Sequence, residues 1–133
     1  MHSLLGTIGI VLCMPASHHF GWAQTQSEYT QSARAELRAA ESELNDVLAS
    51  LIEMAEGNPS SVAKLKQAQA AWEAFRDAHI KAYWPSEEPG WYGSAHPMCV
   101  AFELTRLTKA RVTELREMTN RTGADLCVCL WPD

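Results

Sequence analysis

The chain has no excess of positive charge. Eleven Lys and Arg side chains stand against 16 Asp and Glu among 133 residues, a formal net charge of -5, and every one of these charges lies beyond residue 27. Nucleic acids and anionic membrane surfaces are themselves negative, so the composition argues against both as partners. The charge is compatible with a basic protein partner, and it also simply keeps a small domain soluble.

The sequence also lacks a nucleophile–base motif, a phosphate-binding loop and internal repeats. Two pairs of neighbouring acids occur, Glu41 with Glu43 and Glu87 with Glu88. Glycoside hydrolysis needs two carboxylates that face each other across a cleft at about 5–10 Å, and near neighbours on a helix do not face each other. We therefore expect no enzymatic activity and no cofactor.

No apolar run is long enough to span a bilayer. The segment from Leu4 to Met14 instead has the length of the apolar region of a secretory signal, and Gly21-Trp22-Ala23 offers small residues at the usual cleavage positions. We expect a signal peptide over residues 1–23 and a mature domain over residues 24–133. The protein should be periplasmic or secreted, with no stable membrane insertion unless the leader is retained.

Cysteine is scarce. A lipid anchor on Cys13 is disfavoured, because the three residues before it lack the small side chain expected ahead of a lipidated cysteine. Cleavage leaves an odd number of thiols, and we expect one disulfide between Cys99 and either Cys127 or Cys129. The alternative is a zinc or copper site built from these three thiols and His96, although their spacing is unusual for a structural zinc site.

Helical periodicity is what the chain has in abundance. A first helix is expected over about 27–56 and should end with Gly57 as a left-handed cap before Pro59. A second should begin at Ser60 or Ser61, either of which can cap it, and end near Trp84. The first helix has a narrow heptad seam. Its members are Ala33, Ala40, Val47 and Met54 in one column and Leu37, Leu44 and Leu51 in the other.

A third helix is expected over about 97–120, after an ordered loop over 85–97 that is rich in Pro and Gly. The tail over 125–133 is too apolar for a free end and should pack back. The fold class is all-α: a small antiparallel helical bundle made of a long helical hairpin and a third helix. Inward positions are expected at Val62, Leu65, Trp72, Phe75, His79 and Tyr83 in the second helix and at Phe102, Thr105, Thr108, Val112, Leu115 and Met118 in the third.

Three short motifs, spread over roughly residues 28 to 115, resemble those of the LprI-like lysozyme-inhibitor family of small bacterial envelope proteins. The first is Glu41-x-x-Leu44-Asn45, the second is Ala68-Gln69-x-x-Trp72-x-x-Phe75-Arg76-Asp77, and the third is Gly93-Ser94 followed by Leu107-Thr108-x-x-Arg111-x-x-x-Leu115. One departure is Ile80, at a position where family members often carry a cysteine. The matching positions are Leu44, Asn45, Gln69, Trp72, Arg76, Asp77, Thr108 and Arg111.

The resemblance implies that the domain binds and inhibits a lysozyme-type muramidase, which is a basic protein, without catalysis of its own. An alternative is a structural or stress-related envelope module with another target, and a second alternative is the metal-binding protein described above. Within the motif, Trp72 and Arg76 lie one helical turn apart, where the guanidinium can stack on the indole. We expect Trp72 to be a core anchor between the first two helices rather than the edge of a contact surface.

The loop contains acids and aromatic residues close together. Glu87, Glu88, Trp91 and Tyr92 make a candidate protein-contact surface, because loops carry function and aromatic side chains dominate contact energies. The same aromatics could equally form a small core beneath the loop.

Overall fold

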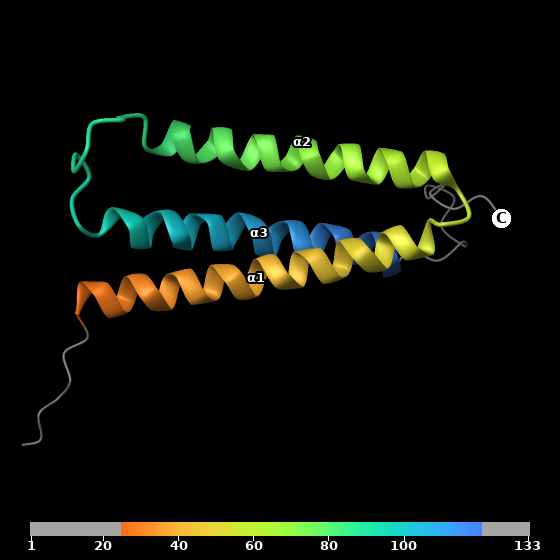
Figure 1. Cartoon of the computed structure of the whole chain (residues 1–133), viewed down its shortest axis with the longest axis horizontal. Helices are drawn as coiled ribbons and strands as arrows, with labels where there is room; N and C mark the ends of the chain where they lie inside the picture. The colour runs from red at the N-terminus through yellow and green to blue at the C-terminus, as the bar shows by residue number, and fades with distance from the viewer. Residues whose placement is uncertain (1–24, 121–133) are drawn as a thin grey trace, which may run out of the picture.

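The computed structural model describes residues 25–120, which form three α-helices: α1 (Gln26–Met54), α2 (Pro59–Tyr83) and α3 (His96–Asn120). Helices α1 and α3 lie side by side and run in the same direction, while α2 runs opposite to both (Figure 1). The all-α bundle expected from the sequence is confirmed, and the helix bounds lie close to the expected ones.

Several expectations fall on residues outside the described range. These are the signal peptide, the disfavoured lipid anchor on Cys13, the packing of the tail, and the thiols of Cys127 and Cys129. None of the three described helices is both long and apolar enough to cross a membrane.

The helix ends show two corrections. Helix α1 begins with a reciprocal cap, in which the Thr25 hydroxyl accepts a hydrogen bond from the Glu28 amide and the Glu28 carboxylate accepts one from the Thr25 amide. The expected cap of α2 at Ser60 or Ser61 is wrong. Asn58 caps this helix, and its Oδ1 accepts a hydrogen bond from the Ser61 amide at 3.1 Å. The helix begins earlier in the chain than expected, because Pro59 has the φ suited to the first helical position.

The left-handed cap expected at Gly57 is also wrong. Helix α1 ends at Met54, and its C-cap is Ala55, whose amide still donates to the carbonyls of Leu51 and Ile52. Among residues 25–120, positive φ occurs at Gly90 and Gly93, both in the loop between α2 and α3, and not at Gly57.

The tightest packing in the bundle joins α1 to α3, whereas α2 contacts α3 over a smaller surface. Small side chains line the first part of the α1–α3 seam, where Ala33, Ala40 and Ala101 are all buried. Small residues let two helix backbones approach, so these positions favour a long, close contact. The heptad seam is confirmed at its centre and wrong at Met54, which is 52% exposed because it lies at the very end of α1.

The hydrophobic core lies at the end of the bundle where all three helices meet. Its buried members are Leu44, Leu51, Ala55, Leu65, Val112 and Leu115. Toward the other end α2 stands apart from α1 (Figure 1). The inward placement expected for Phe75 and Tyr83 is therefore wrong, since they are 54% and 62% exposed, and the same holds for Phe102 on α3.

Candidate functional site

The family motif forms a polar layer between α2 and α3 in the middle of the bundle. Gln69 is buried, its amide oxygen accepts a hydrogen bond from Arg111 Nε at 3.4 Å, and its amide nitrogen donates to Glu73 at 3.1 Å. Arg111 also pairs with Glu114 at 3.1 Å. A buried amide needs such partners, so this network fixes which faces of the two helices meet.

Trp72 and Arg76 extend this layer toward α1. Trp72 is half-buried and packs against the hydrophobic core. The Arg76 guanidinium lies 5.5 Å from the centre of the Trp72 ring, within the range of a cation–π contact. The same guanidinium lies 3.2 Å from Asp77 and 3.9 Å from Glu41 of α1, so one side chain links α2 to α1.

The remaining motif positions divide between core and surface. Leu44 is buried in the core, and Thr108 is fully buried with a hydroxyl that has no hydrogen-bond partner among residues 25–120. Asn45 and Asp77 are exposed. Most of the motif therefore holds the three helices together, which explains why it is spread over all of them.

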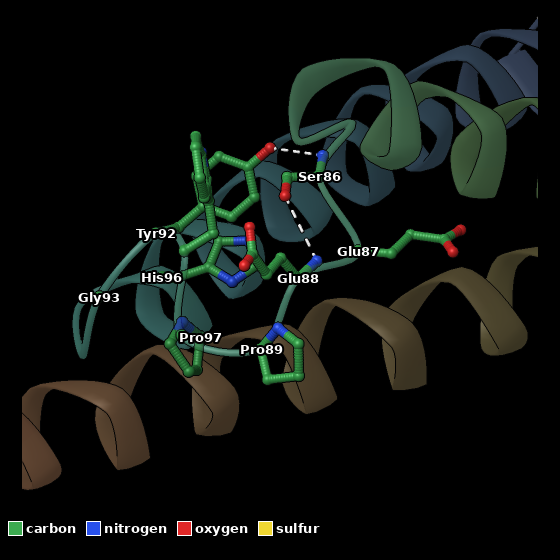
Figure 2. Close-up of a pocket in the computed structure, with 10 residues that line it drawn as sticks. Ser86, Glu87, Glu88, Pro89, Tyr92, Gly93, His96 and Pro97 are labelled. Carbon is green, nitrogen blue, oxygen red and sulfur yellow. Dashed lines mark hydrogen bonds between the residues drawn. The ribbon is translucent and has the colours of Figure 1, made fainter.

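The loop between α2 and α3 is held by its own hydrogen bonds (Figure 2). The Ser86 amide donates to the Tyr92 hydroxyl at 2.7 Å, and the Glu88 amide donates to the Ser86 hydroxyl at 3.3 Å. Gly90 and Gly93, with φ of 80° and 75°, supply left-handed turns that other residues rarely adopt. The loop is thus ordered, as its composition indicated.

The candidate contact residues line a pocket of about 330 Å³ at this loop, together with His96 and Pro97 from the start of α3. Glu87, Glu88 and Trp91 are exposed, while Tyr92 is half-buried. All four residues line this pocket, but the Glu87 side chain points away from Tyr92 and His96 (Figure 2). Tyr92 also has a structural role through its bond to Ser86.

Beside the pocket, aromatic rings follow one another from α2 into α3. Adjacent ring centres lie 4.8–5.7 Å apart, the usual spacing of aromatic pairs. The sequence analysis placed the members from α2 on one face of that helix, but it did not predict that their rings continue into the loop and α3. The row consists of Phe75, His79, Tyr83, Trp84, His96 and Tyr92.

One ion-pair cluster lies next to this row. Glu103 of α3 is 2.8 Å from His79 Nε2 of α2 and 2.6 Å from Arg106. The pKa of Glu103 is lowered to about 2, mainly by the hydrogen bond from Arg106 and also by the one from His79. Partial burial of the carboxylate raises the pKa, but by less than these hydrogen bonds lower it. Sequence reasoning did not anticipate this contact, because its partners lie on different helices.

The metal-site alternative gains no support from the described residues. Between residues 25 and 120, no three His, Cys, Asp or Glu side chains are grouped closely enough to hold a metal ion. His96 and Cys99 lie in the first turn of α3, and the other two proposed ligands, Cys127 and Cys129, lie outside the described range.

Comparison with known proteins identifies one relationship. The family described as lysozyme inhibitor LprI matches residues 19–115, well over half of the chain. No curated protein and no solved structure matches. The matched range contains all three helices except the end of α3, and it includes the polar layer and the loop described above. The chain therefore belongs to the LprI lysozyme-inhibitor family.

Proposed function

We propose that the protein acts in the bacterial envelope or outside the cell by binding a lysozyme-type muramidase and blocking its activity. The family description supports the target class, since it names inhibitors and not enzymes. The net charge of -5 supports the pairing physically, because complementary charge accelerates the encounter with a basic protein.

The contact surface in this proposal is the α2–α3 loop, defined by Glu87, Glu88 and Trp91 with Tyr92 at its edge. The observation that carries it is the exposed Trp91 beside two carboxylates that form no ion pair with any residue between 25 and 120. Exposed aromatic residues are common anchors of protein interfaces, and unpaired acids are free to meet basic side chains.

The loop is also well placed for docking. It lies at one end of the bundle, where α1 and α3 begin and α2 ends (Figure 1). The hydrophobic core lies at the other end. Changes in the loop should therefore alter binding without unfolding the protein.

The test compares two double variants with the same change in charge. Glu87→Lys with Glu88→Lys alters the loop, whereas Glu53→Lys with Glu56→Lys alters exposed acids at the opposite end of the bundle. Association with a basic lysozyme is measured by surface plasmon resonance at several salt concentrations. The loop variant should associate at least tenfold more slowly than the control variant at about 0.15 M salt, where the Debye length is about 8 Å.

Equal rates for the two variants would show that only overall charge matters and that the loop is not the contact surface. No binding by the unchanged protein would remove the lysozyme proposal and leave the structural or stress-related envelope module as the better account.

A further inference from the structure

One face of α3 carries three groups that residues 25–120 leave unpaired or exposed. Cys99, Phe102 and Lys109 are separated by three and seven residues, so they lie on the same face of the helix. Within the described range, the Cys99 thiol is free, Phe102 is 47% exposed, and Lys109 forms no ion pair. Counted back from the end of α3, this face presents a positive charge, then an aromatic ring, then a thiol.

Tyr83 of α2 borders this face. Its ring centre lies 5.3 Å from that of His79, and His79 contacts Glu103, the neighbour of Phe102 on α3. Tyr83 is 62% exposed, and it lies in the half of the bundle that the hydrophobic core does not reach. Two large rings, one from each helix, therefore remain largely uncovered where apolar packing is sparse.

The chain continues beyond Asn120 for 13 residues (133 minus 120), which lie outside the described range. This tail has the same order of chemistry as the face of α3. Asp125 precedes an apolar segment that runs from Leu126 to Trp131. An acid can pair with an ammonium group, and aliphatic side chains pack against aromatic rings. The segment also contains Cys129, one of the two expected disulfide partners of α3.

We propose that residues 121–131 of the same chain fold back and lie along this face of α3. Asp125 then pairs with Lys109, the apolar segment covers the two exposed rings, and Cys129 lies next to Cys99. The arrangement completes the domain, and it does not depend on the lysozyme target.

The three groups on α3 lie at different distances from the start of the tail. At ~1.5 Å per residue, Lys109 is about 17 Å from Asn120, Phe102 is about 27 Å away and Cys99 is about 32 Å away. The tail begins at Asn120, so a segment that follows this face runs antiparallel to α3 and meets the lysine first.

The tail reaches these distances in the same order. At no more than about 3.6 Å per residue, an extended chain places Asp125 up to about 18 Å from Asn120, Val128 up to about 29 Å and Cys129 up to about 32 Å. Alternate side chains of an extended segment point to opposite sides, and every residue from Leu126 to Trp131 is apolar. The segment can therefore cover the rings while Cys129 faces α3.

The groove on the other side of α3 fits the tail less well. Ile80 and Leu104 line it, and Leu104 is two residues from Phe102, which places it on nearly the opposite side of the helix. The hydrophobic core joins all three helices at the end where the tail begins (Figure 1). A tail bound for the groove would have to cross that junction, whereas the face of Phe102 is reached directly.

A double-mutant cycle tests the contact. The exported protein is kept under reducing conditions, so that a disulfide cannot hold the tail in place. Val128→Ser with Leu130→Ser removes apolar side chains from the tail, and Tyr83→Ala with Phe102→Ala removes the rings. Urea denaturation should show that the tail variant lowers the folding equilibrium constant at least tenfold when the rings are present and less than threefold when they are absent.

Ile80→Ala with Leu104→Ala is the matched control, because it removes one apolar side chain from α2 and one from α3 on the groove side. In this background the tail variant should still lower the folding equilibrium constant at least tenfold. An effect of the tail that is independent of the rings, or that disappears with Ile80 and Leu104 instead, would overturn the proposal.

NMR of the same reduced protein locates the tail. Nuclear Overhauser contacts are expected between the methyl groups of Val128 or Leu130 and the ring protons of Tyr83 or Phe102. In an equal mixture of isotope-labelled and unlabelled chains, these contacts should arise within one chain. Contacts between chains would assign the face to a second copy, and an absence of contacts would show that the tail does not dock there; either result would overturn the proposal.

Discussion

His79 of α2 and Glu103 of α3 are joined across the helix interface, with His79 Nε2 2.8 Å from Glu103 Oε1. This contact lies in the half of the bundle that the hydrophobic core does not reach. Arg106 holds the same carboxylate from the next turn of α3. A polar cluster therefore secures α2 where apolar packing is sparse.

The lowered pKa of Glu103 predicts how stability depends on pH. The pKa is about 2 in the folded protein against 4.5 as its ordinary value, so the cluster contributes fully above about pH 4.5. The contribution is lost as pH falls from about 4.5 to 2. Because solvent screens the cluster, we expect its contribution to the free energy of unfolding to be about 1–2 kcal/mol.

Urea denaturation of Glu103→Gln tests this. At pH 6 the variant should be less stable than the unchanged protein by about 1–2 kcal/mol, and the difference should shrink as pH approaches 2. Glu53→Gln, at a position without an ion pair among residues 25–120, serves as the control. A difference for Glu103→Gln that stays constant with pH would show that the carboxylate is not paired in solution.

Trp72→Ala should destabilise the fold through lost packing against the core. We expect about 3 kcal/mol, at the low end for a large aromatic residue because Trp72 is only half-buried. Phe75→Ala is the matched control on the same helix, where the exposed ring should cost less than about 1 kcal/mol. Chemical denaturation measures both, and a similar small loss for the two would place Trp72 on a contact surface instead.

The length of the chain after α3 narrows the choice between Cys127 and Cys129 as the disulfide partner of Cys99. Cys99 and Asn120 are 21 residues apart on α3 (120 minus 99), about 32 Å at ~1.5 Å per residue. The seven residues from Asn120 to Cys127 extend to about 25 Å at most, and the nine to Cys129 extend to about 32 Å. The Cα atoms of a disulfide lie about 4.4–6.8 Å apart, so Cys127 could reach Cys99 only if the segment after Asn120 were fully extended. We therefore predict the pairing Cys99–Cys129.

Peptide mapping of the exported protein without reduction identifies the pairing. A peptide linking Cys99 to Cys129 is expected, and in the entropy model the bridge would stabilise the fold by about 3–4 kcal/mol. A Cys99–Cys127 peptide would contradict the reach argument, and three free thiols would contradict the disulfide itself.

Removal of the signal peptide on export determines the mass of the mature protein. Cleavage after Ala23, at the small residues that follow the apolar segment, should leave a protein that begins at Gln24. Intact mass spectrometry of the exported protein measures this. A mass that still contains residues 1–23 would contradict cleavage, and a diacylglycerol adduct on Cys13 would replace it with lipid anchoring.

Local signals made most of the fold predictable. Pro59 and Pro85 delimit α2, and the spacing of Ala33, Ala40, Leu44 and Leu51 marks the face of α1 that is buried. Periodicity shows which face of a helix is apolar, but not how far its neighbour follows it. The error at Phe75, Tyr83 and Phe102 has this cause, since α2 stands apart from α1 at the end toward the loop.

The site was predictable only in part. Acids and aromatic residues close together marked the loop, and its four candidate residues do line one pocket. His96 packs between the rings of Trp84 and Tyr92, and His79 contacts Glu103, so both relationships join residues that are far apart in the sequence or on different elements. A local sequence pattern predicts neither relationship, because both arise from tertiary packing.

The most direct test of the account is a cell-wall lysis assay. Lysozyme activity is measured while the purified protein is added from substoichiometric amounts to a large molar excess, with the Glu87→Lys, Glu88→Lys variant alongside. We predict that the unchanged protein lowers the lysis rate in a dose-dependent manner and that the loop variant needs at least tenfold more protein for the same effect. An unchanged lysis rate at large excess of the folded protein would contradict the proposal that the protein inhibits lysozyme.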